Sequence, residues 1–284
     1  MGLSDKVVIT CALTGAIANK AQCPHIPYTA EEIAEEARRV YEAGAAVVHI
    51  HAREDDGSPT INVEAFRRIH EAVRDLSPVL INFSTGAIGV TREQRIAHIP
   101  ICKPEIAALN MGTMNYAKYS PRRKDFVFSM EFLNPIPDII YYLKTMQENG
   151  VQPECECFDV GQLETVYPLI DMGILKNFQV SCILGVVGAM QATARNLAHL
   201  SSLVPQGVPW QVIGISSEQW MLCATALALG GNIRVGLEDN FYLSPGVMAE
   251  GNAPLVEKAA RMARDIGREP ATVEEARQLL KLTA

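Results

Sequence analysis

Polar side chains alternate with apolar ones in the segment VVHIHAR, residues 47–53. Alternate residues of a β-strand point to the same face, so His49, His51 and Arg53 share one face of the predicted strand. Two imidazoles placed two residues apart on a strand can bind one metal ion and leave room for further ligands. The spacing therefore predicts a strand that carries chemistry rather than one that only fills a core.

An arginine and two carboxylates occur together in the sequence RVGLED near the C-terminus. Arg234 and Glu238 share strand parity, so both are expected to point inward. A buried arginine needs an acidic partner, which Glu156 or Asp239 can supply. An arginine paired with an acid beside a Lewis-acidic metal is suited to proton transfer and to stabilising an enolate.

The elements that must position these residues alternate along the chain. Apolar runs predict strands and amphipathic runs predict helices. The predicted strands are 6–14, 45–53, 79–86, 106–112, 153–161, 178–185, 209–216 and 232–239. The predicted helices are 29–44, 62–76, 91–99, 134–150, 162–174, 192–204, 217–231, 252–267 and 273–282. Eight strand–helix units in about 250 residues are typical of a (β/α)8 barrel.

We therefore expect an α/β fold, a (β/α)8 TIM barrel, as a single domain over residues 1–284 with a C-terminal helical extension over 268–284. A doubly wound open sheet is the alternative, but TGAIANK after the first strand is not its glycine-rich turn. Reactive groups of such barrels gather at the C-terminal ends of the strands. The polar residues there are Thr14, His49, His51, Arg53, Ser84, Thr85, Asn110, Glu154, Glu156, Asp159, Ser216, Ser217, Arg234, Glu238 and Asp239.

Barrel closure makes the first, second and eighth strands neighbours, which brings Glu238 close to His49 and His51. Two histidines and a carboxylate with one open position are typical of catalytic zinc, and iron(II) accepts the same set. The alternatives are that the histidines belong to the core and that Glu238 belongs to a solvated acidic turn. The four remaining histidines are expected at the surface: His25, His70, His98 and His199.

Composition excludes several classes of protein. The chain has 284 residues, 48% apolar and 20% charged, with a formal net charge of −7, so it lacks a basic surface for nucleic acid. No apolar run reaches the roughly 18 residues that span a bilayer, and the N-terminus lacks signal-peptide features. Seven scattered cysteines are expected to be buried and inert, which fits a cytoplasmic protein.

Seven segments resemble, in the same order, those of the β-keto acid cleavage enzyme family: VVITCALTGA, HIHAREDDGSPT, INFSTG, KPEIAALNMGT, PECECFDVG, ILGVVGAM and RVGLEDN. The resemblance covers nearly the whole chain. It implies a zinc-dependent barrel, in a homotetramer, that converts a β-keto acid and acetyl-CoA into acetoacetate and a new acyl-CoA. The alternatives are a metal-dependent aldolase or hydrolase that needs no CoA and, more remotely, a keto-acid sensor.

The same resemblance implies roles for individual residues. The implied metal ligands are His49, His51 and Glu238. The implied catalytic residues are Asp239, Arg234 and Glu156. The implied substrate-binding residues are Ser84, Thr85, Gly86, Asn110 and Ile17.

Two positions depart from the family pattern. Ile17 stands where a family member that recognises an amine carries a glutamate, so a neutral, apolar β-keto acid is expected. Ala108 replaces a threonine that contacts the substrate carboxylate. The segment 113–133 has no clear periodicity, and its basic residues are expected either to meet CoA phosphates or to form a solvated charge run. These residues are Arg122, Arg123 and Lys124, of which either arginine is the second-choice anchor for a keto diacid.

Overall fold

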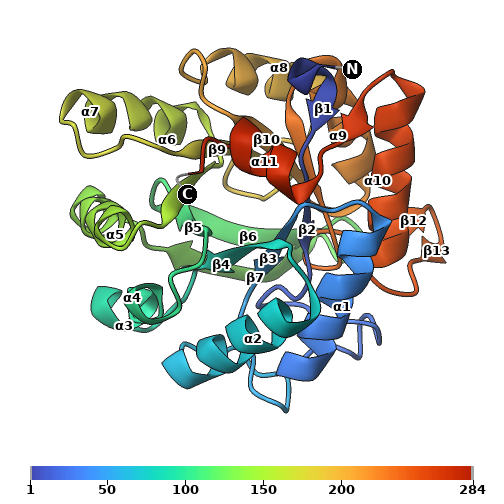
Figure 1. The fold of residues 1–284 in the computed structure, drawn as a ribbon, viewed down its shortest axis with the longest axis horizontal. Helices are drawn as coiled ribbons and strands as arrows, with labels where there is room; N and C mark the ends of the chain where they lie inside the picture. Colours follow the sequence, from blue (N-terminus) through green and yellow to red (C-terminus); the bar gives the residue numbers. More distant parts are fainter. Residues whose placement is uncertain (1, 283–284) are drawn as a thin grey trace.

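Eight parallel strands close into a barrel with helices around it (Figure 1). The computed structural model describes residues 2–282. The closed order of the barrel is β10 (Trp210–Gly214), β11 (Asn232–Val235), β2 (Ile9–Ala12), β3 (Val47–Ile50), β4 (Leu80–Ser84), β5 (Ile106–Asn110), β8 (Gln152–Cys157) and β9 (Gln179–Leu184). The predicted (β/α)8 barrel is therefore confirmed.

Helices follow the strands of the barrel. They are α1 (Ala30–Ala43), α2 (Val63–Leu76), α3 (Arg92–Ile96), α4 (Ile99–Cys102), α5 (Ile136–Glu148), α6 (Val160–Glu164), α7 (Val166–Asp171), α8 (Ala194–Ser202), α9 (Gln219–Ala228), α10 (Ala253–Asp265) and α11 (Val273–Leu279), with short 3₁₀ turns at Leu3–Asp5 and Ser216–Glu218. The helix predicted over 91–99 ends early, as α3, and a separate short helix, α4, begins at its predicted end, whereas the region of the helix predicted over 162–174 is divided into α6 and α7. Pro100 is the second residue of α4, and proline suits the first turn of a new helix.

The predicted ends of α1 are confirmed. The Thr29 hydroxyl accepts a hydrogen bond from the Glu32 amide, and Gly44 ends the helix in a left-handed conformation with φ 114°. All residues of β2, β3, β4, β5, β8 and β9 are buried. Strands covered by helices outside and by side chains inside read as nearly continuous apolar runs, which explains why apolar runs in the sequence located them.

The C-terminal segment closes the N-terminal end of the barrel. Helix α11 lies over the barrel centre in Figure 1, and Ala276 packs in one apolar cluster with Val8, Leu80 and Ile106. Strand β1 (Lys6–Val7) pairs with β14 (Glu269–Pro270) beside it. A site open to substrate must therefore lie at the opposite, C-terminal end of the barrel strands. The assignment of residues 1–284 to a single domain stays a prediction.

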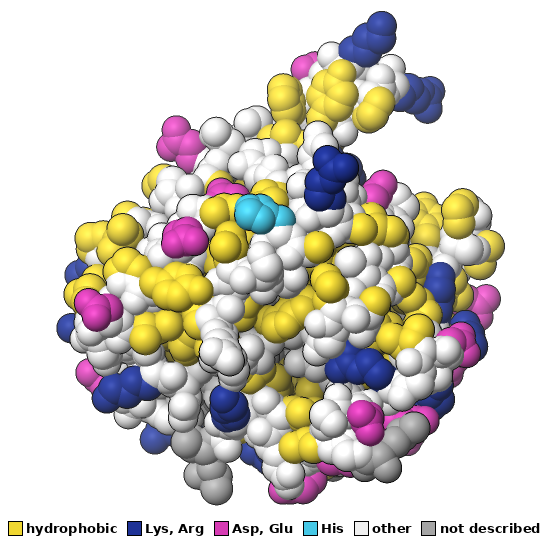
Figure 2. All heavy atoms as spheres, turned by 90° about the horizontal axis from the view of Figure 1, so that it is seen from above, with side chains coloured by type: hydrophobic (Ala, Val, Ile, Leu, Met, Phe, Trp, Pro, Cys, Tyr) yellow, Lys and Arg dark blue, Asp and Glu magenta, His cyan; other side chains and the backbone are white. Residues whose placement is uncertain are grey.

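The segment 113–133 forms a β-hairpin, which the sequence analysis did not predict. Its strands are β6 (Met114–Ser120) and β7 (Asp125–Phe132), and Lys124 turns the chain with φ 53°. Figure 2 shows a slender projection with lysine and arginine side chains near its end. A second, smaller hairpin joins β12 (Tyr242–Ser244) and β13 (Val247–Met248). Among residues 2–282, none of the helices combines the length and apolarity needed to cross a bilayer.

Candidate metal centre and active site

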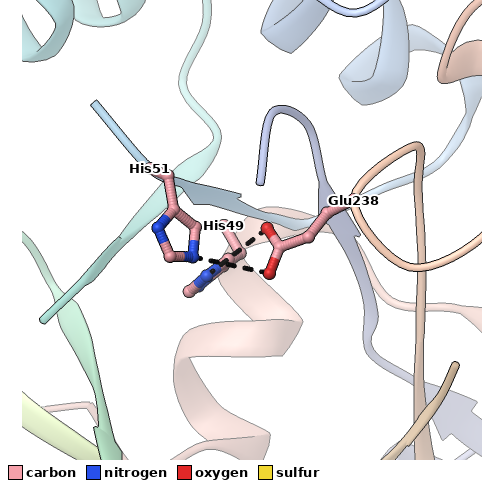
Figure 3. A group of neighbouring side chains, drawn as sticks. All are labelled: His49, His51 and Glu238. Carbon is pink, nitrogen blue, oxygen red and sulfur yellow. Dashed lines mark ion pairs between the residues drawn. The ribbon is translucent and has the colours of Figure 1, made fainter. Parts of the chain in front are cut away.

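His49, His51 and Glu238 converge at the C-terminal end of the barrel (Figure 3). One ligand atom from each lies within 4.8 Å of the others. His49 Nε2 is 3.7 Å from Glu238 Oε2, and His51 Nε2 is 3.5 Å from Glu238 Oε1. Two ligands held about 2.1 Å from one tetrahedral ion are roughly 3.4 Å apart, so the observed spacing fits a shared metal ion.

The buried polar atoms of this group also fit a metal ion. Within residues 2–282, His49 Nδ1 and Glu238 Oε2 have no hydrogen-bond partner. Burial holds the pKa of His49 well below its usual range against the opposing charge of Glu238, so the ring is neutral at pH 7. Burial acts to raise the pKa of Glu238, but Arg234 and the two imidazoles together hold it well below its usual range. Neutral imidazoles and an ionised carboxylate are the forms that bind metals.

Glu238 reaches the histidines through a turn rather than along a strand. Strand β11 ends at Val235, so the predicted strand over 232–239 is four residues too long. Gly236 has φ 135°, and a Cβ atom there would lie 2.2 Å from the Ala12 carbonyl oxygen. The amides of Asp239 and Asn240 then donate to the Gly236 carbonyl. The bend therefore depends on glycine, because no other residue fits this close approach to β2.

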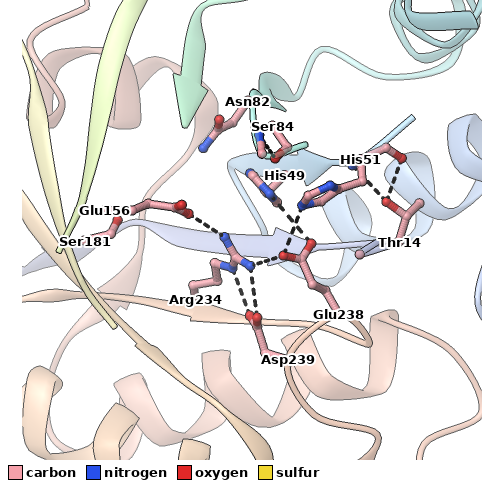
Figure 4. Close-up of polar contacts among 12 residues, drawn as sticks. Thr14, His49, His51, Asn82, Ser84, Glu156, Ser181, Arg234, Glu238 and Asp239 are labelled. Carbon is pink, nitrogen blue, oxygen red and sulfur yellow. Dashed lines mark hydrogen bonds and ion pairs between the residues drawn. The ribbon is translucent and has the colours of Figure 1, made fainter. Parts of the chain in front are cut away.

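Arg234 joins three carboxylates beneath the mouth of the barrel (Figure 4). Its Nε and Nη2 donate to Asp239 over 2.8 and 2.9 Å, and Nη2 also donates to Glu238 Oε1 over 2.6 Å. Its Nη1 lies 3.5 Å from Glu156 Oε1. Arg234 is only 2% exposed, so the acidic partners expected for a buried arginine are present.

The protein environment gives different pKa values to Asp239 and Glu156, the two acids that flank Arg234. Burial raises the pKa of Asp239 to about 6, against the lowering effect of Arg234 and with a further rise from Glu238. Burial and the charge of Glu154 raise the pKa of Glu156 to about 8. Asp239 is thus ionised at neutral pH and Glu156 is protonated. A pair of acids in different protonation states can supply both a base and an acid at the same pH.

The cluster opens into a cavity of about 920 Å³. All five expected substrate-binding residues line it: Ile17, Ser84, Thr85, Gly86 and Asn110. Ser84 Oγ accepts from the Gly86 amide over 3.1 Å, and Asn110 Nδ2 donates to Glu156 Oε2 over 2.6 Å. The Thr85 hydroxyl donates to the Ala108 carbonyl over 2.6 Å, so it holds β4 against β5. Ile17 is 56% exposed in this lining.

Much of the cavity wall is apolar, and the sequence analysis missed it. Hairpin side chains of β6 and β7 face the cavity together with residues at, or just after, the C-terminal ends of β8, β9 and β10. The apolar residues of this wall are Tyr116, Phe128, Met130, Phe132, Phe158, Ile183, Val186, Ile213 and Ile215. The alternation of Phe126, Phe128, Met130 and Phe132 after the PRRK turn was the available signal for this hairpin.

Two other strand-end residues shape the loops around the site. Arg53 donates to the carbonyls of Gly15, Gly57 and Ala18 over 3.0, 2.6 and 2.6 Å. Arg53 therefore anchors the loop that carries Ile17 and does not join the metal ligands. The Thr14 hydroxyl accepts from the His51 amide and donates to the His51 carbonyl, each over 2.9 Å, so it fixes the backbone of a candidate ligand.

One prediction about the remaining histidines is wrong. His98 is 1% exposed and stacks on Phe66, with ring centroids 3.9 Å apart and an angle of 9° between the planes. It is buried because α3 and α4 turn its ring toward α2 rather than toward solvent. His70 is half-buried, whereas His25 and His199 are exposed as expected. All seven cysteines are buried and unpaired, as predicted.

Comparisons with known proteins agree with this geometry. A family model described as "beta-keto acid cleavage enzyme" matches residues 6–282. The chain is 40% identical to the 3-keto-5-aminohexanoate cleavage enzyme of Fusobacterium nucleatum subsp. nucleatum, covering 99% of both chains. It is 33% identical to the 3,5-dioxohexanoate:acetyl-CoA acetone transferase of Paraburkholderia graminis, covering 99% of this chain and 97% of the relative.

The fold has a counterpart among solved structures as well. The apo structure of ObcA superposes with a TM-score of 0.76 at 20% identity, covering 93% of this chain and 67% of ObcA, which shows a shared fold. The family match over residues 6–282 and the full-length relatives decide the assignment. The chain belongs to the beta-keto acid cleavage enzyme family.

Proposed function

We propose that this protein is an acyltransferase that cleaves a β-keto acid with acetyl-CoA, releasing acetoacetate and a new acyl-CoA. Family membership and the name of the Paraburkholderia graminis relative, an acetyl-CoA acetone transferase, support the reaction class. The observation that carries the proposal is the pairing of Arg234 with Asp239 beside His49, His51 and Glu238 in one cavity. A metal-dependent aldolase or hydrolase that needs no CoA is the second candidate, since the same donors suit it.

We propose Zn²⁺ as the metal held by His49, His51 and Glu238, with another divalent ion such as iron(II) as the second choice. The three-ligand set leaves a coordination position open, as catalytic metal sites do. When bound, such an ion supplies Lewis-acid polarisation of substrate oxygens. The remaining chemistry belongs to side chains of this chain.

Asp239 accepts the C2 proton of the β-keto acid, which is acidic because C2 lies between two carbonyl groups. Its carboxylate is held by two hydrogen bonds from Arg234, and a pKa of about 6 suits a base that works near neutral pH. Ser84, Gly86 and Asn110 supply polar groups for the substrate carboxylate. Glu156, protonated at pH 7 with a pKa of about 8, provides a hydrogen-bond donor on the opposite side of Arg234.

The carbon skeleton then changes in two steps. The C2 enolate attacks the acetyl-CoA carbonyl, a C–C bond forms and the CoA thiolate leaves. The thiolate adds to the C3 ketone of the same molecule, and the original C2–C3 bond breaks. The electron pair returns to C2, which takes back the proton from Asp239. The products are acetoacetate and the acyl-CoA of the remaining fragment.

The substrate is proposed to carry a neutral, apolar group beyond the ketone. Ile17 and the aromatic wall of the hairpin line the cavity and offer no counter-charge for an amine. Placing an unpaired ammonium against such apolar surface is unfavourable, because the charge loses part of its hydration without gaining a partner. A keto diacid anchored by Arg122 or Arg123 is the second choice, because neither arginine is among the residues that line the cavity.

The β6–β7 hairpin is a candidate contact for CoA. Lys118 and Tyr119 line the cavity, and Arg122, Arg123 and Lys124 lie at the turn beyond them. Cations at this position suit the phosphates of CoA, although a solvated charge run explains them equally well. A homotetramer and a cytoplasmic location stay predictions of the sequence.

The proposed function is tested with purified protein, a panel of β-keto acids and acetyl-CoA. Acetoacetate and acyl-CoA should form in equal amounts, and only when both substrates are present. Consumption of the keto acid without acetyl-CoA would favour the aldolase or hydrolase. No turnover of any β-keto acid by metal-loaded protein would overturn the proposal.

A further inference from the structure

A buried polar layer crosses the barrel below the metal centre. Glu154 is fully buried, and its Oε1 accepts from Ser181 Oγ over 2.5 Å and from Gln211 Nε2 over 2.8 Å. Its Oε2 accepts from Asn82 Nδ2. Thr10 extends the layer by donating to Gln211 Oε1 over 2.9 Å. Hydrogen bonds therefore link β2, β10, β9 and β8 to β4, the neighbour of the strand that carries His49.

The bond to Glu154 decides which way the Asn82 amide faces. A carboxylate accepts but does not donate, so Asn82 must turn its NH₂ group toward Glu154. The Oδ1 atom then points away from Glu154 and is buried without a hydrogen-bond partner within residues 2–282. Asn82 Oδ1 is therefore a hydrogen-bond acceptor of fixed orientation that lacks a donor.

His49 is the neighbour that needs such an acceptor. His49 and Asn82 are directly paired in the β3–β4 ladder, and His49 Nδ1 is also buried without a partner. A ring that donates from Nδ1 keeps its lone pair on Nε2, the atom that faces Glu238 at 3.7 Å.

We propose that Asn82 is a positioning residue whose Oδ1 accepts the Nδ1 proton of His49, with Glu154 setting the orientation of the amide. The relay from carboxylate to amide to imidazole selects the ring tautomer that presents Nε2 to the metal. This inference rests on the metal site of the proposed function. Partners of this kind orient ligating histidines, and losing one typically weakens metal binding about 10- to 100-fold.

The test combines two variants with a matched control. Asn82→Leu removes the acceptor while keeping a similar volume. Glu154→Gln lets the new amide donate to Asn82 Oδ1, which allows Asn82 to turn. Thr10→Val removes a hydrogen bond of the same layer without touching Asn82 or His49. Circular dichroism identifies the variants that are folded, and competition with a chelator gives the Kd for Zn²⁺.

Wild type should carry the His49 proton on Nδ1, observed by ¹⁵N NMR of histidine-labelled protein without metal. Asn82→Leu should weaken Zn²⁺ binding about 10- to 100-fold and lose the tautomer preference, with Glu154→Gln changing both in the same direction. Thr10→Val should stay within about twofold of wild type. If Asn82→Leu does not fold, Glu154→Gln and the wild-type tautomer still decide the question.

A proton on Nε2 of His49 in wild type would overturn the relay, as would a folded Asn82→Leu or Glu154→Gln variant with unchanged tautomer and unchanged Kd. Failure of the proposed function looks different. In that case wild type binds no Zn²⁺ in the chelator assay, while the tautomer of the metal-free ring still reports whether Asn82 accepts its proton.

Discussion

Arg234 binds Asp239 through two parallel hydrogen bonds of 2.8 and 2.9 Å, deep in the barrel mouth. The same guanidinium also donates to Glu238, one of the candidate metal ligands. A bidentate arginine–carboxylate pair has a fixed orientation, so the position of Asp239 is tied to that of the metal site. The base and the Lewis acid of the proposed reaction therefore share one rigid support.

Asp239→Asn should keep the metal and lose turnover. Asparagine retains an acceptor for Arg234 but cannot take up the C2 proton, and losing a general base typically lowers kcat about 10²- to 10⁴-fold. Metal content and kcat are measured on the same preparation. Asp265→Asn, on the exposed surface of α10, is the control and should behave as wild type. Near-normal turnover of Asp239→Asn with intact metal would remove Asp239 from the mechanism.

The purified protein should contain close to one divalent metal ion per chain when chelators are avoided. Elemental analysis identifies the ion, with zinc expected first. Removing it should abolish turnover and lower Tm, because a ligand that binds only the native state stabilises that state. His51→Ala should bind metal more weakly than wild type because one of three protein ligands is lost. Absence of metal even after reconstitution would exclude this site.

Ile17→Glu should shift specificity toward an amine-bearing substrate. Wild type should prefer 3-oxohexanoate to 3-keto-5-aminohexanoate, and the variant should move the ratio of kcat/KM values roughly fivefold toward the amine, since a partly exposed ion pair contributes about 1 kcal/mol. Ile88→Glu is the control, because Ile88 is an equally exposed isoleucine of the same cavity. A wild type that clearly prefers the amino compound would show that residue 17 does not set specificity.

Gly236→Ala should unfold the protein or displace Glu238. The added Cβ would lie 2.2 Å from the Ala12 carbonyl oxygen, and the backbone is held at φ 135°. We expect a loss of several kcal/mol in the free energy of unfolding, measured with urea. Gly246→Ala, with φ 79° and no atom within 4 Å of the added Cβ, should cost only about 1 kcal/mol. Equal losses in the two variants would contradict a steric role for Gly236.

Because of His98, the free energy of unfolding should decrease as the pH is lowered. Burial lowers the pKa of His98 to about 3, so the folded protein keeps the ring neutral while the unfolded chain takes up a proton near pH 6.5. The unfolded state therefore binds more protons between these values, and stability drops as pH falls below about 6.5. His98→Phe keeps the stacking on Phe66 without titrating. Its free energy of unfolding relative to wild type should rise by about 2 kcal/mol from pH 7 to pH 5, and a constant difference would refute this assignment.

Local spacing alone determined much of this protein. The period of apolar residues identified eight strand–helix units, and H-x-H placed His49 and His51 together because alternate strand residues share a face. A buried Arg234 needs acidic partners, and the two that the sequence suggested, Glu156 and Asp239, lie beside it in the structure. These features follow from covalent geometry over a few residues, so they can be predicted from the sequence by itself.

Tertiary structure decided what the spacing could not. Glu238 reaches the histidines through the Gly236 turn, which exists because β2 passes 2.2 Å from where a side chain would be. The hairpin wall, the burial of His98 and the contact between Asn82 and Glu154 join segments far apart in the chain. Their side-chain orientations are set by packing and hydrogen bonding after the barrel closes, and no local periodicity encodes which distant residues will meet across it.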